Sequence, residues 1–371
     1  SKLNCFLSIR NTESHRFSFV RSVRALPLTP SQPESRYKRS KNIINGEKKM
    51  SREKKKDCMN CLHYDMMEGK KIIQRMFILH RLRKENNMRK NIQVKVKVPQ
   101  FTVITGLTYA QRNSWFGHTM QDLKMDLIYP EDKERKYPCI VWICGGAWLQ
   151  MDRSAHLAYL SELARKGFTV ASLQYRTSNE TPFPGPLEDV KAGIRYLRAH
   201  AGRFHIDPEK IGVMGESAGG YLTCMAALAM DPSFDVGENL EYSSSVQAAC
   251  PWYPPTDFRG FPYDSAEQCA AAPESLLLGK NVMRHAGEAL KCCPVSFVTP
   301  EAPPFLIIHG KDDHTVPFTQ SELLYEKLEK AGCDVTLLAI EGADHADLHF
   351  FQEKIWEEIG DFFRKSLGNV R

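Results

Sequence analysis

Hydrophobic and polar positions follow two different patterns along this 371-residue chain, and the change between them falls near residue 92. Beyond that point, short apolar runs alternate with longer stretches in which apolar residues recur at helical spacing. An apolar run such as Cys139–Ile143 is typical of a strand buried on both faces. The alternation of such strands with helices predicts an α/β fold with a parallel sheet.

The pattern locates the expected elements. The expected strands are 94–98, 101–105, 123–129, 139–143, 168–173, 211–214, 246–252, 305–308 and 335–340. The expected helices are 157–166, 187–200, 218–230, 319–331 and 345–367. The strands before Pro130 are expected to pair antiparallel at an edge of the sheet, because polar and apolar residues alternate in them.

The regular alternation breaks between Pro254 and Pro304, where prolines, glycines and aromatic residues surround two helical fragments, 266–278 and 284–290. An insertion after the carboxyl end of a strand lies near the crevice where α/β sheets bind ligands. We therefore predict a cap-like insertion over the active site at about 254–304. The alternative is an appendage that packs on the domain without contacting substrate.

Residues 1–90 show little periodicity and carry the basic excess of the chain. They hold 23 lysines and arginines against eight acidic residues, whereas the remaining residues hold 27 against 36. A basic segment can bind nucleic acid or an anionic membrane surface, but a solvated, disordered leader is the preferred interpretation. Only 70–90 is expected to form a short basic helix, with Ile72, Ile73, Met76, Phe77 and Leu79 on or near one face.

The N-terminal part of the chain has two further features, an internal methionine ahead of the expected strands and a pair of cysteines. The chain begins at Ser1, and Met88 stands just before the expected strands, so residues 1–87 are interpreted as a dispensable or non-native leader to a catalytic domain at 91–371. Cys58 and Cys61 with His63 resemble half of a zinc site, but no second pair follows at suitable spacing, and no metal is expected.

Composition narrows the class of protein further. The sequence is 42% hydrophobic, yet no stretch reaches the roughly 18 apolar residues of a spanning helix, and no secretory signal is visible. Most of the 11 cysteines stand singly in apolar contexts, as expected in a reducing compartment. We expect a cytoplasmic protein without membrane insertion or nucleic-acid binding, and the oligomeric state is left open.

The candidate nucleophile is Ser217, in the sequence Gly215-Glu-Ser-Ala-Gly219 between an expected strand and an expected helix. A G-x-S-x-G motif in that context holds the serine on a sharp turn, where small residues leave room for the bend. The hydroxyl needs a base, which needs an acid to orient it, and on α/β-hydrolase sheets these follow in the order acid, then histidine. Two late strands are followed by loops that supply both groups.

Several residues compete for the two remaining roles. The spacing G-x-x-D-x-x-V-P selects Asp313 over Asp312 as the acid. His345 is preferred as the base because it follows the last expected strand, whereas His309 is expected to be structural. A zinc pair of His345 and His349 is disfavoured, because no glutamate stands between them as in H-E-x-x-H.

Backbone N–H groups are expected to stabilise the oxyanion of a tetrahedral intermediate. After the strand ending at Ile143, the small residues Gly145, Gly146 and Ala147 leave such groups free, and Ala218 follows the nucleophile.

Six motifs in register resemble the α/β-hydrolase esterases over about residues 100–367. They are Cys144-Gly-Gly-Ala-Trp148, Gln174-Tyr-Arg176, Phe183–Val190, His205-Ile-Asp-Pro208, Gly215–Gly220 and the Asp313 and His345 loops. The sequences LKMDLIYP and DVKAGIRYLRAHAGRFHIDPEKIGVMGESAGGYL are most similar to the bacterial esterase/lipase branch that includes acetylxylan and feruloyl esterases. The resemblance implies a mostly parallel eight-stranded sheet with helices on both faces.

The same resemblance implies the roles of the site residues. Ser217 would be the nucleophile, His345 the general base and acid, Asp313 its orienter, and the amides of Gly146, Ala147 and Ala218 the oxyanion hole. Cys144 stands where the related motif has histidine, and Ala147 where it has glycine. Trp148, Trp252 and Tyr253 are expected to form walls of the substrate pocket.

The predicted function is hydrolysis of carboxylic esters without a cofactor. By resemblance, the substrates would be short-acyl or aromatic esters, as small molecules or as acetylated or feruloylated oligosaccharides. One alternative is a prolyl-oligopeptidase-like peptidase, although no propeller repeat precedes the domain in this sequence. The other is a catalytically silent binding module, which the complete triad disfavours.

Overall fold

The computed structural model describes residues 66–81, 90–96, 100–132 and 134–368. The chain divides into two units, Ser1–Val94 and Lys95–Arg371, and each is described by itself. The Cys58 and Cys61 half-site and residues 1–65 and 82–89 of the predicted leader lie outside the described residues. Within the described residues, no helix is both long and apolar enough to cross a bilayer.

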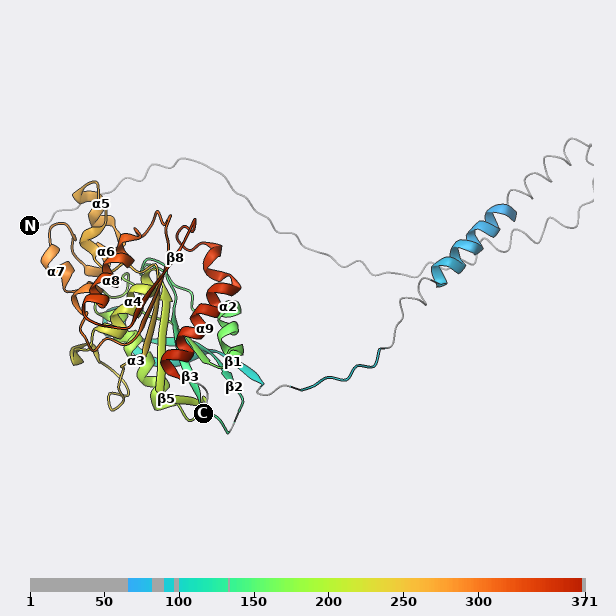
Figure 1. Ribbon diagram of the computed structural model, residues 1–371, viewed down its shortest axis with the longest axis horizontal. Helices are drawn as coiled ribbons and strands as arrows, with labels where there is room; N and C mark the ends of the chain where they lie inside the picture. The colour runs from blue at the N-terminus through green and yellow to red at the C-terminus, as the bar shows by residue number, and fades with distance from the viewer. Residues whose placement is uncertain (1–65, 82–89, 97–99, 133, 369–371) are drawn as a thin grey trace, which may run out of the picture. The chain divides into compact units, whose positions relative to one another are not determined.

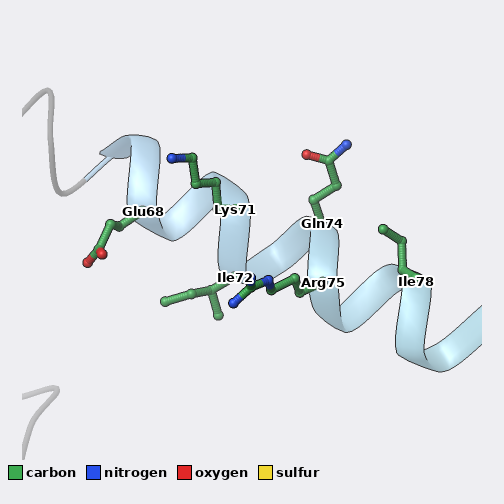
Figure 2. A pocket seen from close by; sticks show the side chains of 6 residues that line it. All are labelled: Glu68, Lys71, Ile72, Gln74, Arg75 and Ile78. Atoms are coloured by element: carbon green, nitrogen blue, oxygen red, sulfur yellow. The ribbon is translucent and has the colours of Figure 1, made fainter.

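In the first unit, residues 66–81 form a helix, which confirms the predicted helix as far as residue 81 and extends it by four residues toward the N-terminus. Its large apolar side chains are exposed, with 72% of Phe77 accessible. A shallow hollow runs along it, bordered by Glu68, Lys71, Ile72, Gln74, Arg75 and Ile78. All six side chains come from this one helix and are exposed, so the hollow is not an enclosed site (Figure 2).

In the second unit, eight strands form a single sheet in the order β1-β2-β4-β3-β5-β6-β7-β8 (Figure 1). The strands are β1 (Phe101–Ser114), β2 (Thr119–Pro130), β3 (Tyr137–Ile143), β4 (Thr169–Leu173), β5 (Ile206–Glu216), β6 (Ala248–Trp252), β7 (Phe305–Gly310) and β8 (Val335–Ile340). The pairs β1–β2 and β2–β4 are antiparallel and the other five are parallel. The mostly parallel eight-stranded sheet is therefore confirmed.

The antiparallel edge differs from the prediction in where it begins. Residues 94–96 are not in a strand, although Val94 and Val96 alternate with lysines. Both valines are more than 70% exposed, and an alternating pattern produces a strand only where a partner covers one face. Strand β1 instead runs on to Ser114, and two register irregularities interrupt its pairing with β2.

Helices cover both faces of the sheet, as the continuous apolar strands predict. In β3, Cys139, Val141 and Ile143 belong to one buried cluster, and Ile140 and Trp142 belong to the other. The first cluster includes residues of α3 (Gly185–Ala199), α4 (Ala218–Leu228) and α8 (Thr319–Lys330). The second includes residues of α2 (Leu157–Arg165) and α9 (Glu353–Leu367), and Figure 1 shows these two helices on the opposite side of the sheet.

The insertion at 254–304 holds three short helices and two 3-10 turns. These are η3 (Phe258–Gly260), α5 (Ala266–Ala271), α6 (Pro273–Leu278), α7 (Ala286–Leu290) and η4 (Pro294–Ser296). The predicted helix 266–278 is broken at Ala272, because the residue before a proline disfavours helical torsion angles. Buried side chains of the insertion, including Phe258, Leu277 and Cys293, join the cluster that contains α3 and α4.

The last predicted helix, 345–367, is also divided. Residues after β8 form a loop, then the short 3-10 helix η5 (Leu348–Phe351), then α9 from Glu353. The Asp347 carboxylate caps η5 by accepting from the N–H of His349. His345 therefore lies in the loop, before either helical segment.

Candidate active site

Ser217 occupies a tight turn between β5 and α4. Its φ of 54° and ψ of −119° are strained for a residue with a side chain, and the turn is held by a hydrogen bond from the Ser217 N–H to the Trp252 carbonyl (3.0 Å). A Cβ on Gly219 would lie 2.0 Å from the Ile143 carbonyl oxygen. Glycine is required there because β3 passes directly beneath the turn, as expected from the motif.

Two loops at the carboxyl ends of β7 and β8 bring Asp313 and His345 to Ser217. His345 Nε2 lies 3.0 Å from Ser217 Oγ, and His345 Nδ1 lies 2.7 Å from Asp313 Oδ2. An ionised carboxylate only accepts hydrogen bonds, so Nδ1 carries the proton and Nε2 is free to accept from the serine. The three residues predicted as a triad are thus joined in the order that acyl transfer needs.

Asp313 is held as an anion. Burial opposes its ionisation, but hydrogen bonds from His309 and His345 and from the Val316 N–H outweigh burial, so the pKa of Asp313 lies well below its ordinary value. Its Oδ1 accepts from the N–H groups of Thr315 and Val316, both at 2.8 Å. Asp312 beside it is exposed. The geometry selects Asp313, as the spacing did.

The other candidate histidines have different surroundings. His309 is fully buried, with Nδ1 2.6 Å from Ser321 Oγ and Nε2 3.2 Å from Asp313 Oδ2. It is structural, as predicted, but it also contacts the acid, which the sequence did not indicate. His349 pairs with Asp347 at the surface and is not brought to His345 as a metal ligand.

The 144–148 loop (Cys144-Gly-Gly-Ala-Trp148) faces the nucleophile. Gly146, Ala147 and Trp148 all have positive φ, which turns successive N–H groups toward one side. Within the described part of the chain, the N–H groups of Gly146, Ala147 and Ala218 have no protein acceptor. These donors are available to an oxyanion formed at Ser217.

A pocket of about 590 Å³ opens over these groups. It is lined by Gly145, Gly146, Ala147, Leu149, Gln150, Glu216, Ser217, Tyr253, Thr315, His345 and Ala346. No residue of the insertion 254–304 lines it. Buried side chains of the insertion join the cluster that contains α4, and the cap over the active site stays a prediction.

The three aromatic residues predicted to form pocket walls lie in different surroundings. Tyr253 borders the pocket. Trp148 is 1% exposed, and its indole packs edge-on against Tyr221 and Phe258 in the core. Trp252 is fully buried against Trp142 and Trp356 on the opposite face of the sheet. The assignment of these two tryptophans to the pocket is therefore corrected, because their side chains point into the cores.

A polar cluster that no sequence motif indicated lies beside the nucleophile. Glu216 is 7% exposed, and its carboxylate contacts His156 Nε2 (2.9 Å) and the Tyr253 hydroxyl (2.7 Å). Burial opposes its ionisation, but these partners and the Gly145 N–H lower the pKa of Glu216. Burial and the Glu216 carboxylate raise the pKa of the Cys144 thiol to about 12, so Cys144 is an inert thiol.

The fold and this site define the chain as an α/β-hydrolase: a mostly parallel sheet that places a serine on a strand-to-helix turn, with a histidine and an aspartate on later loops. Within that class, the chain belongs to the BD-FAE family, whose model matches residues 125–328. This confirms the resemblance to the esterase branch of the α/β-hydrolases.

Individual relatives are esterases by name. Esterase LipC of Mycobacterium tuberculosis is 31% identical over 211 residues, covering 56% of this chain and 52% of LipC. The probable carboxylic ester hydrolase LipM of the same organism is 34% identical over 202 residues, covering 52% of this chain and 45% of LipM. The chain thus spans about half the length of these curated relatives.

A solved structure extends the comparison. A truncated form of a carbohydrate esterase from gut microbiota matches with a TM-score of 0.64 and 29% sequence identity. The match covers 71% of this chain and 96% of that one, so nearly all of that protein has a counterpart here.

Proposed function

We propose that this protein is a carboxylic ester hydrolase that works through an acyl-Ser217 intermediate. The proposal rests on the chain of hydrogen bonds from Ser217 through His345 to Asp313, at 3.0 Å and 2.7 Å. That chain lies beside backbone N–H groups without acceptors and opens into a pocket. The esterase names of the relatives support the same reaction.

The geometry suggests the following steps. The Ser217 oxygen bonds to the ester carbonyl carbon while its proton passes to His345 Nε2, and Asp313 stabilises the resulting imidazolium. The carbonyl oxygen becomes an oxyanion that accepts from the N–H groups of Gly146, Ala147 and Ala218. The bond to the alcohol then breaks, and the alcohol oxygen takes the proton from His345. Water repeats the sequence on the acyl-enzyme and releases the acid. No cofactor enters these steps.

The pocket favours a neutral ester with a small or flat acyl group. Among the described residues that line it, the ionisable groups besides His345 are Glu216 and Tyr253, and Glu216 would repel a carboxylate on the substrate. The proposed substrates are short-acyl or aromatic esters, including acetylated or feruloylated carbohydrate. The structural similarity to a carbohydrate esterase supports this class.

The first test is hydrolysis of p-nitrophenyl acetate by the purified protein and by Ser217→Ala. We expect Ser217→Ala to lose at least about 10⁴-fold in kcat, because the acyl-enzyme cannot form. Ser233→Ala, at an exposed serine outside the pocket, is the matched control and is expected to keep full activity. Equal rates for wild type and Ser217→Ala would refute the proposal.

A substrate panel separates the finer alternatives. Acetylated xylo-oligosaccharides, methyl ferulate and p-nitrophenyl butyrate are compared by kcat/KM with a prolyl p-nitroanilide. A preference for the anilide would indicate the peptidase alternative. Absence of turnover on every substrate, together with no labelling of Ser217 by a fluorophosphonate, would indicate a silent binding module.

A further inference from the structure

The carboxylate of Glu216 collects four hydrogen-bond donors from three parts of the fold. Oε1 lies 2.9 Å from His156 Nε2, 3.4 Å from the Gly145 N–H and 3.7 Å from Cys144 Sγ. Oε2 accepts from the Tyr253 hydroxyl at 2.7 Å. Burying a carboxylate is costly unless such donors compensate, so this arrangement specifies the position of each donor as well as that of Glu216.

Two of the donors start the loop that faces the oxyanion. The N–H of Gly145 and the thiol of Cys144 point at Oε1, and the next two residues supply the free N–H groups. The loop has no slack on the side that carries the nucleophile, because a Cβ on Gly145 would come within 2.9 Å of the Glu216 carbonyl oxygen and 3.2 Å of Ser217 Cβ. The position of the loop relative to Ser217 therefore depends on its contacts with Glu216.

A third donor connects Glu216 to the base. The Tyr253 ring packs edge-on against the His345 ring, with 4.6 Å between centroids. Phe350 packs against the same tyrosine at 4.5 Å. The hydroxyl bond to Glu216 holds the far end of the same side chain. His345 is thus held by Asp313 from one side and by Tyr253 across its face.

We infer that Glu216 is a positioning residue for ester hydrolysis: its buried carboxylate keeps the 144–148 loop and, through Tyr253, the His345 ring in the geometry that Ser217 needs. The inference rests on the proposed function. Glu216 does not touch the reacting atoms in this arrangement. It acts through two groups that do: the 144–148 loop, which faces the oxyanion, and His345, which takes the serine proton.

The same atoms could instead be metal ligands, because Cys144, His156 and Glu216 bring their ligand atoms within 4.8 Å of one another. Oε1 and Nε2 are at hydrogen-bond distance, and Oε2 is occupied by Tyr253. These contacts favour the hydrogen-bond network.

The main test is Glu216→Ala, assayed with p-nitrophenyl acetate and by the rate at which a fluorophosphonate labels Ser217. We expect kcat and the labelling rate to fall by about 10- to 100-fold, because small displacements of positioned groups have effects of that size. KM should stay within about threefold, since binding in the pocket does not use Glu216. Glu216→Gln should recover most of the rate, because its amide oxygen can still accept from Gly145 and His156.

The control is Glu274→Ala, which removes another buried glutamate (6% exposed) whose Tyr263 contact lies in the insertion. It is expected to leave kcat and labelling unchanged. Tyr253→Phe keeps the ring against His345 and loses only the hydroxyl bond, so we expect an intermediate loss. The double variant of Glu216→Ala and Tyr253→Phe should be no slower than Glu216→Ala alone, because the two changes break the same bond.

Several results would overturn the inference. Wild-type kcat and labelling in Glu216→Ala would do so, as would losses in the double variant equal to the product of the single losses. If Glu216→Ala does not fold, wild-type kcat in Tyr253→Phe would refute it. Activity lost to dipicolinate and restored by Zn²⁺ would show a metal at the cluster instead. Labelling needs no turnover, so failure of the esterase proposal is recognised separately, by Ser217 labelling without ester hydrolysis.

Discussion

Replacing Asp313 by asparagine tests the electrostatic part of the site with almost no change in shape. The Asp313 Oδ1 accepts from two backbone N–H groups, so the amide oxygen of asparagine is expected to take that position. The NH₂ group then faces His345 Nδ1, which now carries a proton. Two donors repel each other, so the imidazole should shift to the tautomer that is protonated on Nε2.

That tautomer cannot accept the Ser217 proton. The equivalent change in a Ser-His-Asp triad lowers kcat by about 10⁴-fold. At about 1.36 kcal/mol for each factor of ten, the barrier would rise by about 5 kcal/mol. The fold should persist, because three of the four contacts of the side chain can still be made. A melting temperature within several degrees of wild type would show this.

The assay is kcat and KM for p-nitrophenyl acetate, with Asp312→Asn as the matched control. Asp312 is the exposed neighbour of Asp313, so the control makes the same chemical change one residue away and should keep kcat within about twofold. An Asp313→Asn enzyme with more than a tenth of wild-type activity would refute the reasoning. So would an equal loss in Asp312→Asn.

The lowered pKa of Asp313 also predicts how the stability of the fold changes with pH. A carboxylate whose pKa is lower in the folded state stabilises the fold above its unfolded pKa of about 3.9, and this contribution is lost as the pH falls through the folded value. The stability difference between wild type and Asp313→Asn should therefore be constant from about pH 7 to about pH 5 and shrink only below about pH 4. Urea unfolding at these pH values measures it, and a difference that already shrinks near pH 6 would contradict the assignment.

Two further predictions concern the loop and the leader. Gly146→Ala would place a Cβ 2.0 Å from the Gln150 carbonyl oxygen at a φ of 125°. The loop N–H groups must then move, so kcat should fall by about 100-fold or more. The control is Gly202→Ala, whose Cβ would meet no atom within 4 Å and which should keep the wild-type kcat. Deleting residues 1–87 should leave kcat and the melting temperature unchanged, because every strand of the described residues starts after residue 100; loss of folding on deletion would contradict the leader interpretation.

Much of the fold could be predicted because central strands are buried on both faces. The unbroken apolar run of β3 reflects two cores, and β4, β6 and β7, which are buried along their whole length, were placed by the same signal. The outer elements could not be placed as well. The strand expected at 94–98 has the right alternation but no covering layer, and β1 continues to Ser114 through polar residues because β2 supplies the backbone partners.

The meeting of Ser217, Asp313 and His345 was predictable because each follows a strand, and parallel strands end at one edge of the sheet. Which of the aromatic side chains near these residues reach the pocket was not predictable. Trp252 and Tyr253 are neighbours in the chain and both belong to the buried cluster that contains α9, but only Tyr253 also borders the pocket. The partners of Glu216 could not be found from spacing either, since His156 and Tyr253 lie 60 and 37 residues away along the chain.

The two carboxylates of the site have opposite relations to the charges that develop during acyl transfer. Asp313 lies behind the base, where a negative charge stabilises the imidazolium. Glu216 lies behind the 144–148 loop, where an uncompensated negative charge would oppose the oxyanion. Its four hydrogen-bond donors compensate that charge, and the Cys144 thiol is one of them. Loss of this donor in Cys144→Ala should therefore lower kcat for p-nitrophenyl acetate through Glu216 rather than through the nucleophile.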